Sequence, residues 1–558
     1  MERRLLMSGL PLGRPPLTGS ARRSPLLSRL PLPVFVLAVA LAVRGAYLLT
    51  AHGPAFDAPL VDADYYDSLG ERLARGEGFP EGPFWQPPLY PAVLGGLYWL
   101  GGHSLWWPRL LQACLGAFTA ALACGVARRI SGRPGVGVLA GMLVALHGPL
   151  IFYDGELLAT SLGTFLATAA LWLALREPRS FWTALGCGAC MGLGALTVAP
   201  LLLLLPPLAW ALAQGRPVRA VLCGAVCAAL VLCATAFNHA RTGEWLLISA
   251  NGGINLWLGN NADVDGAMAI RPGAAWETLV NEPARYGFHT PASQDAYFTR
   301  RALSWCGSQP LTCASNLLWK LRLLLMAREL PRNEALAVVR SQSPVLWALT
   351  VSPGGVALPY ALLWPLAAAG SVALWRQGRS GTVEARAALT VAGTALLLAA
   401  PSLLFFVSGR YRAPLAPVLC VLAALGLHAL TSRAAPRGVP AAMALAVLGL
   451  SVWPMRLAVD AVDFEAELHY AVGGRRARLG DDVGAVEAWR QAVSRKPDSL
   501  EAGFNLGLAL ERLGRLDEAA HTYEALLRWH PDEARVHSRL AQVRNAVRHG
   551  PPASPVNP

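Results

Sequence analysis

The sequence is poor in charge and almost devoid of lysine. Only 15% of its 558 residues are charged, whereas 54% are hydrophobic. This balance excludes a soluble multidomain protein and is typical of a polytopic membrane protein. Lysine occurs only at Lys320 and Lys496, so the formal net charge of +13 rests on arginine. The arginines fall in short clusters beside apolar runs, where membrane topology explains them, and we therefore expect no nucleic-acid partner.

Cysteine is scarce outside the apolar runs. Eight of the ten cysteines lie inside such runs, where cysteine behaves as a small hydrophobic residue. Cys187 and Cys190 form a CxxC pair, but they fall in the middle of an expected span, so a redox or zinc role is the weaker alternative. Cys306 and Cys313 lie in a polar loop and can form a disulfide if that loop faces an oxidising compartment.

The N-terminal residues indicate how the chain enters the membrane. Residues 1–30 carry six arginines and one acid, and no small-residue cleavage site follows the next apolar run. We therefore expect a basic cytoplasmic tail and an uncleaved first span. The apolar segment 88–102 is shorter than the roughly 20 residues that a crossing helix needs. We expect it to be juxtamembrane or re-entrant, which keeps Arg128, Arg129 and Arg133 in the cytoplasm.

The remaining apolar runs predict an all-α polytopic membrane domain over residues 31–455, with about 11 transmembrane helices. The expected spans are 31–50, 108–127, 135–153, 157–175, 181–199, 200–213, 218–237, 356–375, 385–407, 413–430 and 439–455. Loops 51–107 and 238–355 and the C-terminal tail would face outward. Segment 311–327 contains Lys320 and Arg322, so we expect an amphipathic helix at the interface. Frequent arginine, alanine and glycine suggest a bacterial inner membrane.

The C-terminal region repeats itself at a shift of 34 residues. Gly473 aligns with Gly507, Trp489 with Tyr523, and a proline follows each unit, which is the period of the tetratricopeptide repeat. We expect a domain at 466–549, with repeats at 466–499 and 500–533, a closing helix at 534–549 and a disordered tail at 550–558. Such repeats bind a peptide or partner protein on their concave face. A purely structural cap on the membrane domain is the alternative.

Carboxylates gather in the first external loop, in the stretch DADYYDSLGERL (62–73). Tyr66, Leu69 and Leu73 form an apolar stripe that predicts a short interfacial helix. We expect this helix at 65–75, with Asp62 just before it, where anions are favoured, and Asp64 two residues further along the chain. A simple N-cap role for Asp62 is the alternative.

Three further stretches fall on the expected external side. FYDGELLATS (152–161) puts Asp154 and Glu156 on the same side as Asp62, so acids from two loops can converge; solvated turn acids are the alternative. GRYRAPLAP (409–417) places Arg410 and Arg412 outside, against the positive-inside pattern. Guanidinium groups there suit phosphate binding, and snorkelling to lipid headgroups is the alternative.

The stretches WQPPLYP (85–91) and NGGINLWLGNN (251–261) carry weaker signals. The three prolines of the first stiffen the return of the chain to the membrane. The second is rich in glycine and asparagine, includes Asn255 and a tryptophan, and is either a sugar-contacting turn or simply a loop.

Taken in order, DADYYDSLGERLARGEGF, QPPLYP, DGELLATS, GGINLWLGNN and RYRAPLAP resemble polytopic glycosyltransferases of the GT-C fold, similar to protein O-mannosyltransferases and lipid A aminoarabinose transferases. Asp62, Tyr66 and Gly70 fit the spacing of that family after the first span. Ala63 stands where many members have a second acid. Tetratricopeptide tails also occur in transmembrane O-mannosyltransferases.

The resemblance implies transfer of a sugar from a polyprenyl-phosphate donor to an external acceptor. Asp62 would be the general base, with Asp64 or Glu156 positioning the acceptor, and Arg410 or Arg412 would bind the donor phosphate. A single in-line attack would invert the anomeric centre. Further substrate contacts are expected from Tyr66, Tyr411, Asp154 and Asn255.

Three alternatives stay open. The family implies no metal, but Asp62, Asp64 and Glu156 are hard oxygen ligands that would suit a divalent cation. A transporter or lipid flippase is a second reading, although the expected spans contain almost no ionisable residues for a transport path. A non-catalytic membrane scaffold acting through its repeat domain is the third. In each case we expect membrane lipids as surroundings.

Overall fold

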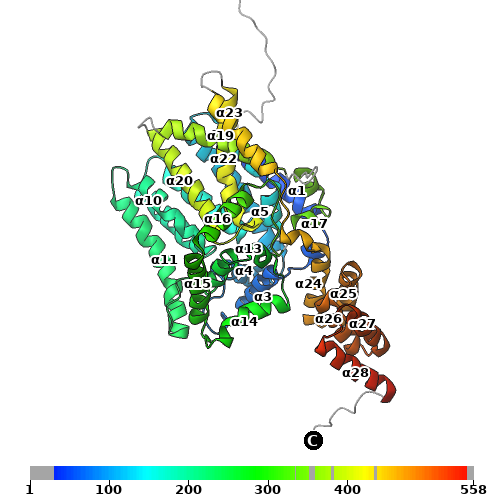
Figure 1. The fold of residues 1–558 in the computed structure, drawn as a ribbon. Coiled ribbons are helices and arrows are strands. Elements are labelled where there is room, and N and C mark those ends of the chain that lie inside the picture. Colours follow the sequence, from blue (N-terminus) through cyan, green and yellow to red (C-terminus); the bar gives the residue numbers. More distant parts are fainter. Residues whose placement is uncertain (1–30, 334, 351–357, 379–382, 433–436, 550–558) are drawn as a thin grey trace, which may run out of the picture.

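The computed structural model describes residues 31–333, 335–350, 358–378, 383–432 and 437–549, and every regular element in these ranges is a helix (Figure 1). The predicted all-α class is therefore confirmed. The predicted tails, 1–30 and 550–558, lie outside the described residues.

Five helical stretches are long and apolar enough to cross a membrane. They are α1 (Leu32–Thr50), α5 (Trp106–Ser131), α11 (Val218–Thr242), α20 (Val383–Leu404) and the run formed by α21 (Gly409–Arg412), η3 (Ala413–Leu415) and α22 (Ala416–Thr431). A sixth arises if α6 (Pro134–Ala145) and α7 (Gly148–Gly155), bent by 48°, count as one. The chain is thus a multi-pass membrane protein.

The other predicted spans also fold as helices. They are α8 (Thr160–Leu175), α9 (Phe181–Ala195), η1 (Ala199–Leu204) with α10 (Leu205–Ala213), α19 (Tyr360–Gly378) and α23 (Gly438–Val452). Several are shorter than a full crossing needs, so the number of about 11 crossings stays a prediction.

Helix α22 lies at the centre of the bundle and is buried from Ala416 to Gly426. Gly370 of α19 and Gly426 of α22 allow these two helices to touch through their backbones. A Cβ atom on Gly370 would overlap the carbonyl oxygen of Leu422, and one on Gly426 would overlap that of Leu366. Small residues at helix contacts permit such close packing in membrane proteins. The second half of α22 is therefore packed closely against α19.

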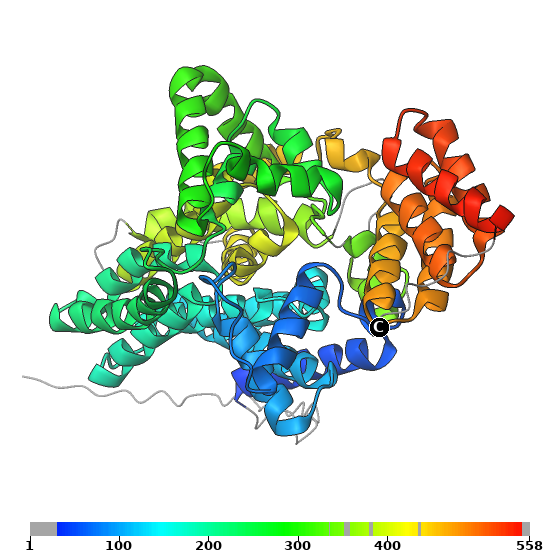
Figure 2. The ribbon, with the colours of Figure 1, turned by 90° about the horizontal axis from the view of Figure 1, so that it is seen from below.

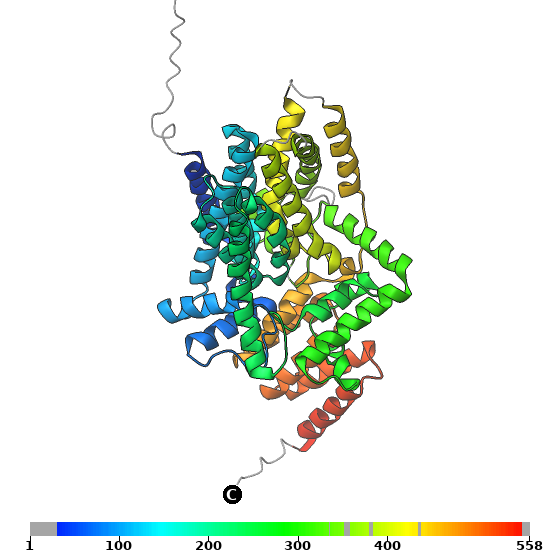
Figure 3. The same ribbon diagram turned by 90° about the vertical axis from the view of Figure 1, so that its left-hand side faces the viewer.

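The helices of the first loop and most of the helices of the long segment 243–350 gather at one end of the bundle, where the repeat domain also lies (Figures 1 and 3). The first loop forms α2 (Pro54–Asp57), α3 (Asp62–Ala74) and α4 (Leu89–Gly101). At 13 residues, α4 is too short to cross, as predicted. The long segment forms α12 (Gly252–Gly259), α13 (Val264–Ala269), α14 (Ala274–Arg285), α15 (Pro291–Ser308), α16 (Pro310–Leu325), α17 (Leu336–Arg340) and α18 (Pro344–Leu349).

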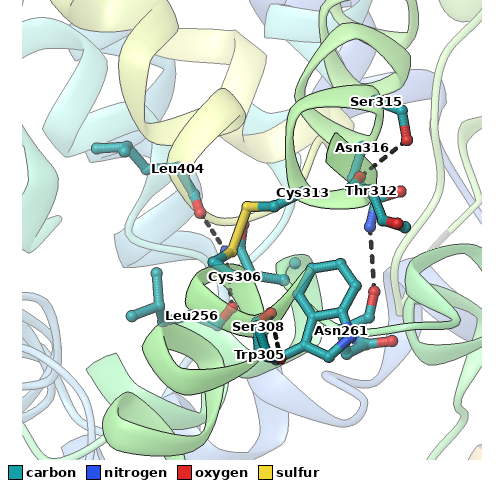
Figure 4. The surroundings of a disulfide bond; sticks show 12 residues. Leu256, Asn261, Trp305, Cys306, Ser308, Thr312, Cys313, Ser315, Asn316 and Leu404 are labelled. Atoms are coloured by element: carbon teal, nitrogen blue, oxygen red, sulfur yellow. Dashed lines mark hydrogen bonds between the residues drawn. A yellow bond between two sulfur atoms is a disulfide. The ribbon is translucent and has the colours of Figure 1, made fainter. Parts of the chain in front are cut away.

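Most of the stretch 251–261 forms helix α12 (Gly252–Gly259), so its interpretation as a turn or loop is wrong. Tertiary contacts outweigh the low helix propensity of its glycines and asparagines. The backbone N–H of Gly253 donates to the carboxylate of Asp295 at 2.6 Å, and Arg301 stacks on the ring of Trp257 at 4.1 Å. Nearby, Cys306 and Cys313 form the anticipated disulfide, which joins the end of α15 to the start of α16 (Figure 4).

The C-terminal region forms five antiparallel helices, as the repeat predicts. They are α24 (Phe464–Arg478), α25 (Asp482–Arg495), α26 (Leu500–Arg512), α27 (Leu516–Trp529) and α28 (Ala534–His549). Gly507 faces the buried ring of Tyr523, and Gly473 faces Trp489 in the first repeat. The aromatic ring thus occupies the space that the glycine leaves free.

One of the two lysines of the chain is buried within this architecture. The Lys320 ammonium donates to the carbonyl oxygens of Gly259 (3.0 Å) and Phe405 (3.2 Å) and to Asn260 Oδ1 (3.1 Å). It thereby joins α16 to the C-terminus of α12, where cations are favoured, and to the end of α20. Burial lowers the pKa of Lys320 to about 8. Segment 311–327 is thus helical as predicted, but its lysine points into the protein.

We predict that Lys320→Met lowers the stability of the protein by about 1–3 kcal/mol, because three buried acceptors lose their donor. Lys496→Met removes the other lysine, which makes no hydrogen bond to a described residue, and should change stability by less than about 0.5 kcal/mol. Thermal unfolding of both variants in detergent measures the difference. Equal melting temperatures would contradict the role given to Lys320.

Candidate active site

Asp62 is the first residue of α3 and lies beside the start of the α21–α22 run. Its Oδ2 atom accepts hydrogen bonds from Arg410 Nη1 and from Asn333 Nδ2, the latter at 2.8 Å. The N-cap of α3 is Val61, so the N-cap reading of Asp62 is wrong. Val61 has a φ of 51°, a left-handed conformation that is rare for a β-branched residue and often occurs at functional sites.

Arg410 is the guanidinium group that reaches this site. Its side chain is 24% exposed and stacks on Tyr411, with the guanidinium carbon 5.2 Å from the ring centroid. Arg332 is the next cation. Burial, together with repulsion from Arg271 and Arg410, lowers the pKa of Arg332 to about 10. Arg410 and Arg332 thus both act on the carboxylate of Asp62, and Arg271 lies close to Arg332, so positive charge exceeds negative charge here, which favours an anion.

Arg412 does not face the exterior as predicted. It is fully buried and donates to the carbonyl oxygens of Met326 (2.8 Å) and Arg328 (2.7 Å) and to the carboxylate of Glu329 (3.1 Å). Its guanidinium also packs on the ring of Tyr360. Burial raises the pKa of Glu329. Arg412 therefore fixes the segment that follows α16 against α21, and only Arg410 borders the site.

Asp64 and Asp67 of α3 bind the repeat domain. The guanidinium of Arg475, on α24, donates to Asp64, to Asp67 at 3.2 Å and to the carbonyl oxygen of Pro59, and Arg478 donates to Asp64. Asp67 is 3% exposed and also accepts a hydrogen bond from Tyr98 at 2.8 Å. The second acid of the predicted catalytic group is thus engaged in joining two domains.

Apolar contacts reinforce this junction. Leu60 packs with Val472 of α24 and Ala488 of α25, and Val61 lies against the same cluster. Seen from below, α24 lies on the side of the repeat domain that faces the membrane domain (Figure 2).

Tyr66 forms part of the inner wall of the first loop. Its ring is buried and meets the ring of Tyr90 edge-on at 5.1 Å, and its hydroxyl donates to Gln86 Oε1. Burial raises the pKa of Tyr66, which keeps the hydroxyl protonated. The predicted contact of Tyr66 with a substrate stays a prediction.

Asp154 and Glu156 are close in sequence but have different surroundings. Asp154 is buried and accepts from Arg44 of α1 at 2.7 Å, with both side chains at most 4% exposed. Its predicted substrate contact lacks support, because this pair lies inside the bundle. Glu156 lines a cavity next to the Asp62 site. The structure therefore brings Glu156, and not Asp154, towards Asp62.

Of the two remaining predicted substrate contacts, Tyr411 lies next to the site and Asn255 is not shown to contact it. Tyr411 is half-buried, packs against Phe406 and lies beneath Arg410. Asn255 is half-buried in α12, and its side chain makes no hydrogen bond to the residues that the structure describes. Its predicted sugar contact is untested.

A cavity of about 280 Å³ lies beside this junction, between the first loop, the long segment and the repeat domain. Val61 and Asn333 line it, so that it borders directly on the pair formed by Asn333 and Asp62. Glu156 and Arg271 contribute from the membrane domain, and α24 supplies the opposite wall. Mixed polar and apolar walls of this kind are typical of ligand pockets.

The described ranges contain no group of three or more His, Cys, Asp or Glu side chains placed to hold a metal ion. Asp62 pairs with Arg410 and Asp64 with Arg475, so these two acids do not converge as ligands. The divalent cation therefore remains an untested alternative.

Two groups at the site were not predicted. Asn333 holds Asp62, and Arg332 adds positive charge beside it. The sequence did contain a hint of this segment, because four of the seven residues from 328 to 334 are charged, in a chain of which only 15% is charged. Arg475 and Arg478 could not have been linked to α3, because charges on a helical repeat are usually solvated.

Residues 479–543 match the family model described as "Tetratricopeptide repeat", which confirms the predicted repeat domain. No curated protein matches the sequence.

Several solved structures are similar to this chain. ArnT from Cupriavidus metallidurans bound to undecaprenyl phosphate has 16% identity and a TM-score of 0.40, over 88% of this chain and 79% of that one. The archaeal oligosaccharyltransferase AglB from Archaeoglobus fulgidus, in complex with an inhibitory peptide and a dolichol-phosphate, has 16% identity and a TM-score of 0.44 over 77% and 55%. The protein O-mannosyltransferase Pmt1-Pmt2 complex of S. cerevisiae bound to the sugar donor has 16% identity and a TM-score of 0.30 over 38% and 32%.

We predict that Arg475→Ala loosens the repeat domain from the first loop, because the buried Asp67 loses its cationic partner. Charge-assisted hydrogen bonds of this kind contribute about 1.5–3 kcal/mol. Arg490→Ala, which removes an exposed pair with Glu518 inside the repeat domain, should cost no more than about 1 kcal/mol. Hydrogen–deuterium exchange of α24 and α3 in detergent should rise only in the first variant. An unchanged exchange rate would contradict the proposed junction.

Proposed function

We propose that this protein is an integral-membrane glycosyltransferase that moves a sugar from a polyprenyl-phosphate donor to an acceptor on the external side of the membrane. The observation that carries the proposal is the contact between Asp62 and Arg410. In this contact a carboxylate that can accept a proton lies next to a guanidinium that can bind phosphate, and Asn333 connects the carboxylate to a neighbouring cavity.

The reaction follows from these two groups. Asp62 takes the proton from the acceptor hydroxyl as its oxygen attacks the anomeric carbon. The bond between that carbon and the phosphate oxygen breaks, and the departing polyprenyl phosphate keeps the electron pair. Arg410 binds the phosphate and stabilises the charge that develops on it. One in-line displacement inverts the anomeric centre.

Donor binding would also prepare the base. Arg410 donates to Asp62 in the present structure, and Asn333 holds the same oxygen. A donor phosphate would compete for the guanidinium of Arg410 and release the carboxylate towards the acceptor. Arg332 and Arg271 keep the surroundings positive, which compensates for the added negative charge.

The positive-inside pattern and the fold together support an external location of the site. The two long loops and the repeat domain lie at the same end of the bundle (Figure 3), as the charge distribution predicts. We place this end outside the cytoplasm, in a bacterial inner membrane. Asp64 anchors the repeat domain and takes no direct part in the chemistry.

We predict that Asp62→Asn lowers the transfer rate roughly a hundredfold to ten-thousandfold, because the acceptor loses its general base. Asp57→Asn removes an exposed carboxylate from the same loop and should leave the rate unchanged. The assay follows radiolabelled sugar from a polyprenyl-phosphate donor in membrane vesicles, and melting temperatures confirm folding. Undiminished transfer by the Asp62 variant would refute the assignment of the base.

Substitutions of Arg410 and Arg412 should have different effects, the first on lipid binding and the second on stability. Arg410→Gln should abolish the binding of undecaprenyl phosphate while the protein stays folded, because its side chain borders the site. Arg412→Gln should destabilise the fold by about 3–5 kcal/mol, since it leaves Glu329 buried without its cation. Thermal unfolding and native mass spectrometry with the lipid separate these effects. Intact lipid binding by the folded Arg410 variant would rule out its role.

A further inference from the structure

The first helix of the repeat domain turns one complete face towards the membrane domain. Phe464, Glu467, Leu468, Ala471, Gly474 and Arg478 of α24 all line the cavity next to the Asp62 site. Their spacing of three or four residues is that of a single helix face. The cavity is therefore built by both domains together, and the repeat domain is one of its walls.

Small side chains in the middle of this face keep the cavity open. Ala471 and Gly474 stand where a larger residue would fill it. A Cβ atom on Gly474 would meet only the flexible end of Arg478, at 3.7 Å. The packing of α24 therefore does not itself require a glycine at position 474. Phe464 and Tyr470 border the same space with aromatic rings.

Some polar side chains of the cavity already bind other groups of the protein, whereas others do not. Arg478 pairs with Asp64, and Arg271 donates to backbone carbonyl oxygens, including those of Ala269 (2.9 Å) and Met268 (3.2 Å). Glu277 and Glu467 make no hydrogen bond or ion pair with a described residue. Burial raises the pKa of Glu467. Arg271 attracts Glu467 electrostatically but makes no hydrogen bond to it, so the carboxylate oxygens of Glu467 and Glu277 are free to accept from a cationic ligand.

We propose that this cavity binds the acceptor as an extended polypeptide segment that carries a basic residue close to the hydroxyl to be glycosylated. The basic residue would pair with Glu467 and Glu277. The hydroxyl would pass Asn333, which lines the cavity and contacts Asp62. The reading of the bound segment as an acceptor rests on the proposed function, whereas peptide binding itself does not.

A polypeptide fits this cavity better than a lipid does. One wall is α24, which packs directly against the part of the chain that matches the tetratricopeptide model, residues 479–543; domains of this class recognise peptide segments. Arg271 and Arg478 of this cavity already donate to groups of the protein, whereas Glu277 and Glu467 do not accept a hydrogen bond from a described residue, so this part of the cavity suits a cation better than the phosphate of a lipid headgroup. A volume of about 280 Å³ is near the lower end of ligand pockets, which begin at roughly 300 Å³, and suits a short stretch of chain.

The test uses the purified full chain in detergent and three fluorescein-labelled nonapeptides. Each has a central serine, and Arg, Ala or Glu stands two positions away. Fluorescence anisotropy should show tightest binding of the Arg peptide. Glu467→Gln combined with Glu277→Gln should weaken that binding about fivefold and leave the Ala peptide unaffected. Glu487→Gln, an exposed carboxylate on α25, serves as the matched control.

Filling the cavity gives an independent readout. Ala471→Trp should weaken binding of every peptide by about tenfold or more, because the indole occupies the space of the ligand. Gly474→Leu provides a second, smaller filling in case the first variant unfolds. Val483→Trp adds the same indole to an exposed site on α25 and should change nothing. Peptide binding that is unchanged in both filled variants, or equal for the Glu and Arg peptides, would overturn the proposal.

Lipid binding and transfer separate this inference from the proposed function. The filled variants should bind undecaprenyl phosphate like the unmodified protein. If they lose peptide binding while Asp62→Asn transfers sugar normally, the peptide site stands and the catalytic assignment falls. If Asp62→Asn abolishes transfer while the filled variants bind and glycosylate the peptides normally, only the peptide site falls.

Discussion

The contact between Arg410 and Asp62 joins residues 348 positions apart, and the account of the site depends on it. Each partner has its own support. Arg410 starts a helical run whose core is fixed by the close approach of Gly370 and Gly426, and its neighbour Arg412 is fixed by Glu329. Asp62 starts α3 and is held by Asn333. The backbone positions of both residues are therefore fixed before any ligand arrives, so that a donor phosphate has only to exchange one partner of Arg410 for another.

The acidic residues of the first loop divide into two tasks. Asp62 faces Arg410 and Arg332, whereas Asp64 and Asp67 bind arginines of the repeat domain. Because all three acids lie on one short helix, the site and the repeat domain share a rigid element. The cavity between them is thus part of the same assembly, and its repeat-domain wall stands at a fixed place relative to Asp62.

Much of this architecture could be read from the sequence. Apolar runs gave the helices of the bundle, and the 34-residue period gave the repeats, because both signals depend on local periodicity. Topology predicted that the first loop and residue 410 lie on the same side of the membrane, although not that Asp62 and Arg410 form an ion pair. What failed depended on tertiary contacts. Asp295 and Lys320 turn 251–261 into a helix, Glu329 draws Arg412 inside, and Arg44 draws Asp154 into the bundle. No local pattern marks such partners.

The most direct test is an electron cryo-microscopy structure of the purified chain with undecaprenyl phosphate. The account predicts density for the phosphate within hydrogen-bonding reach of Arg410, with Asp62 freed from that guanidinium and facing the cavity. Phosphate density at another site, with Asp62 and Arg410 still paired or far apart, would contradict it.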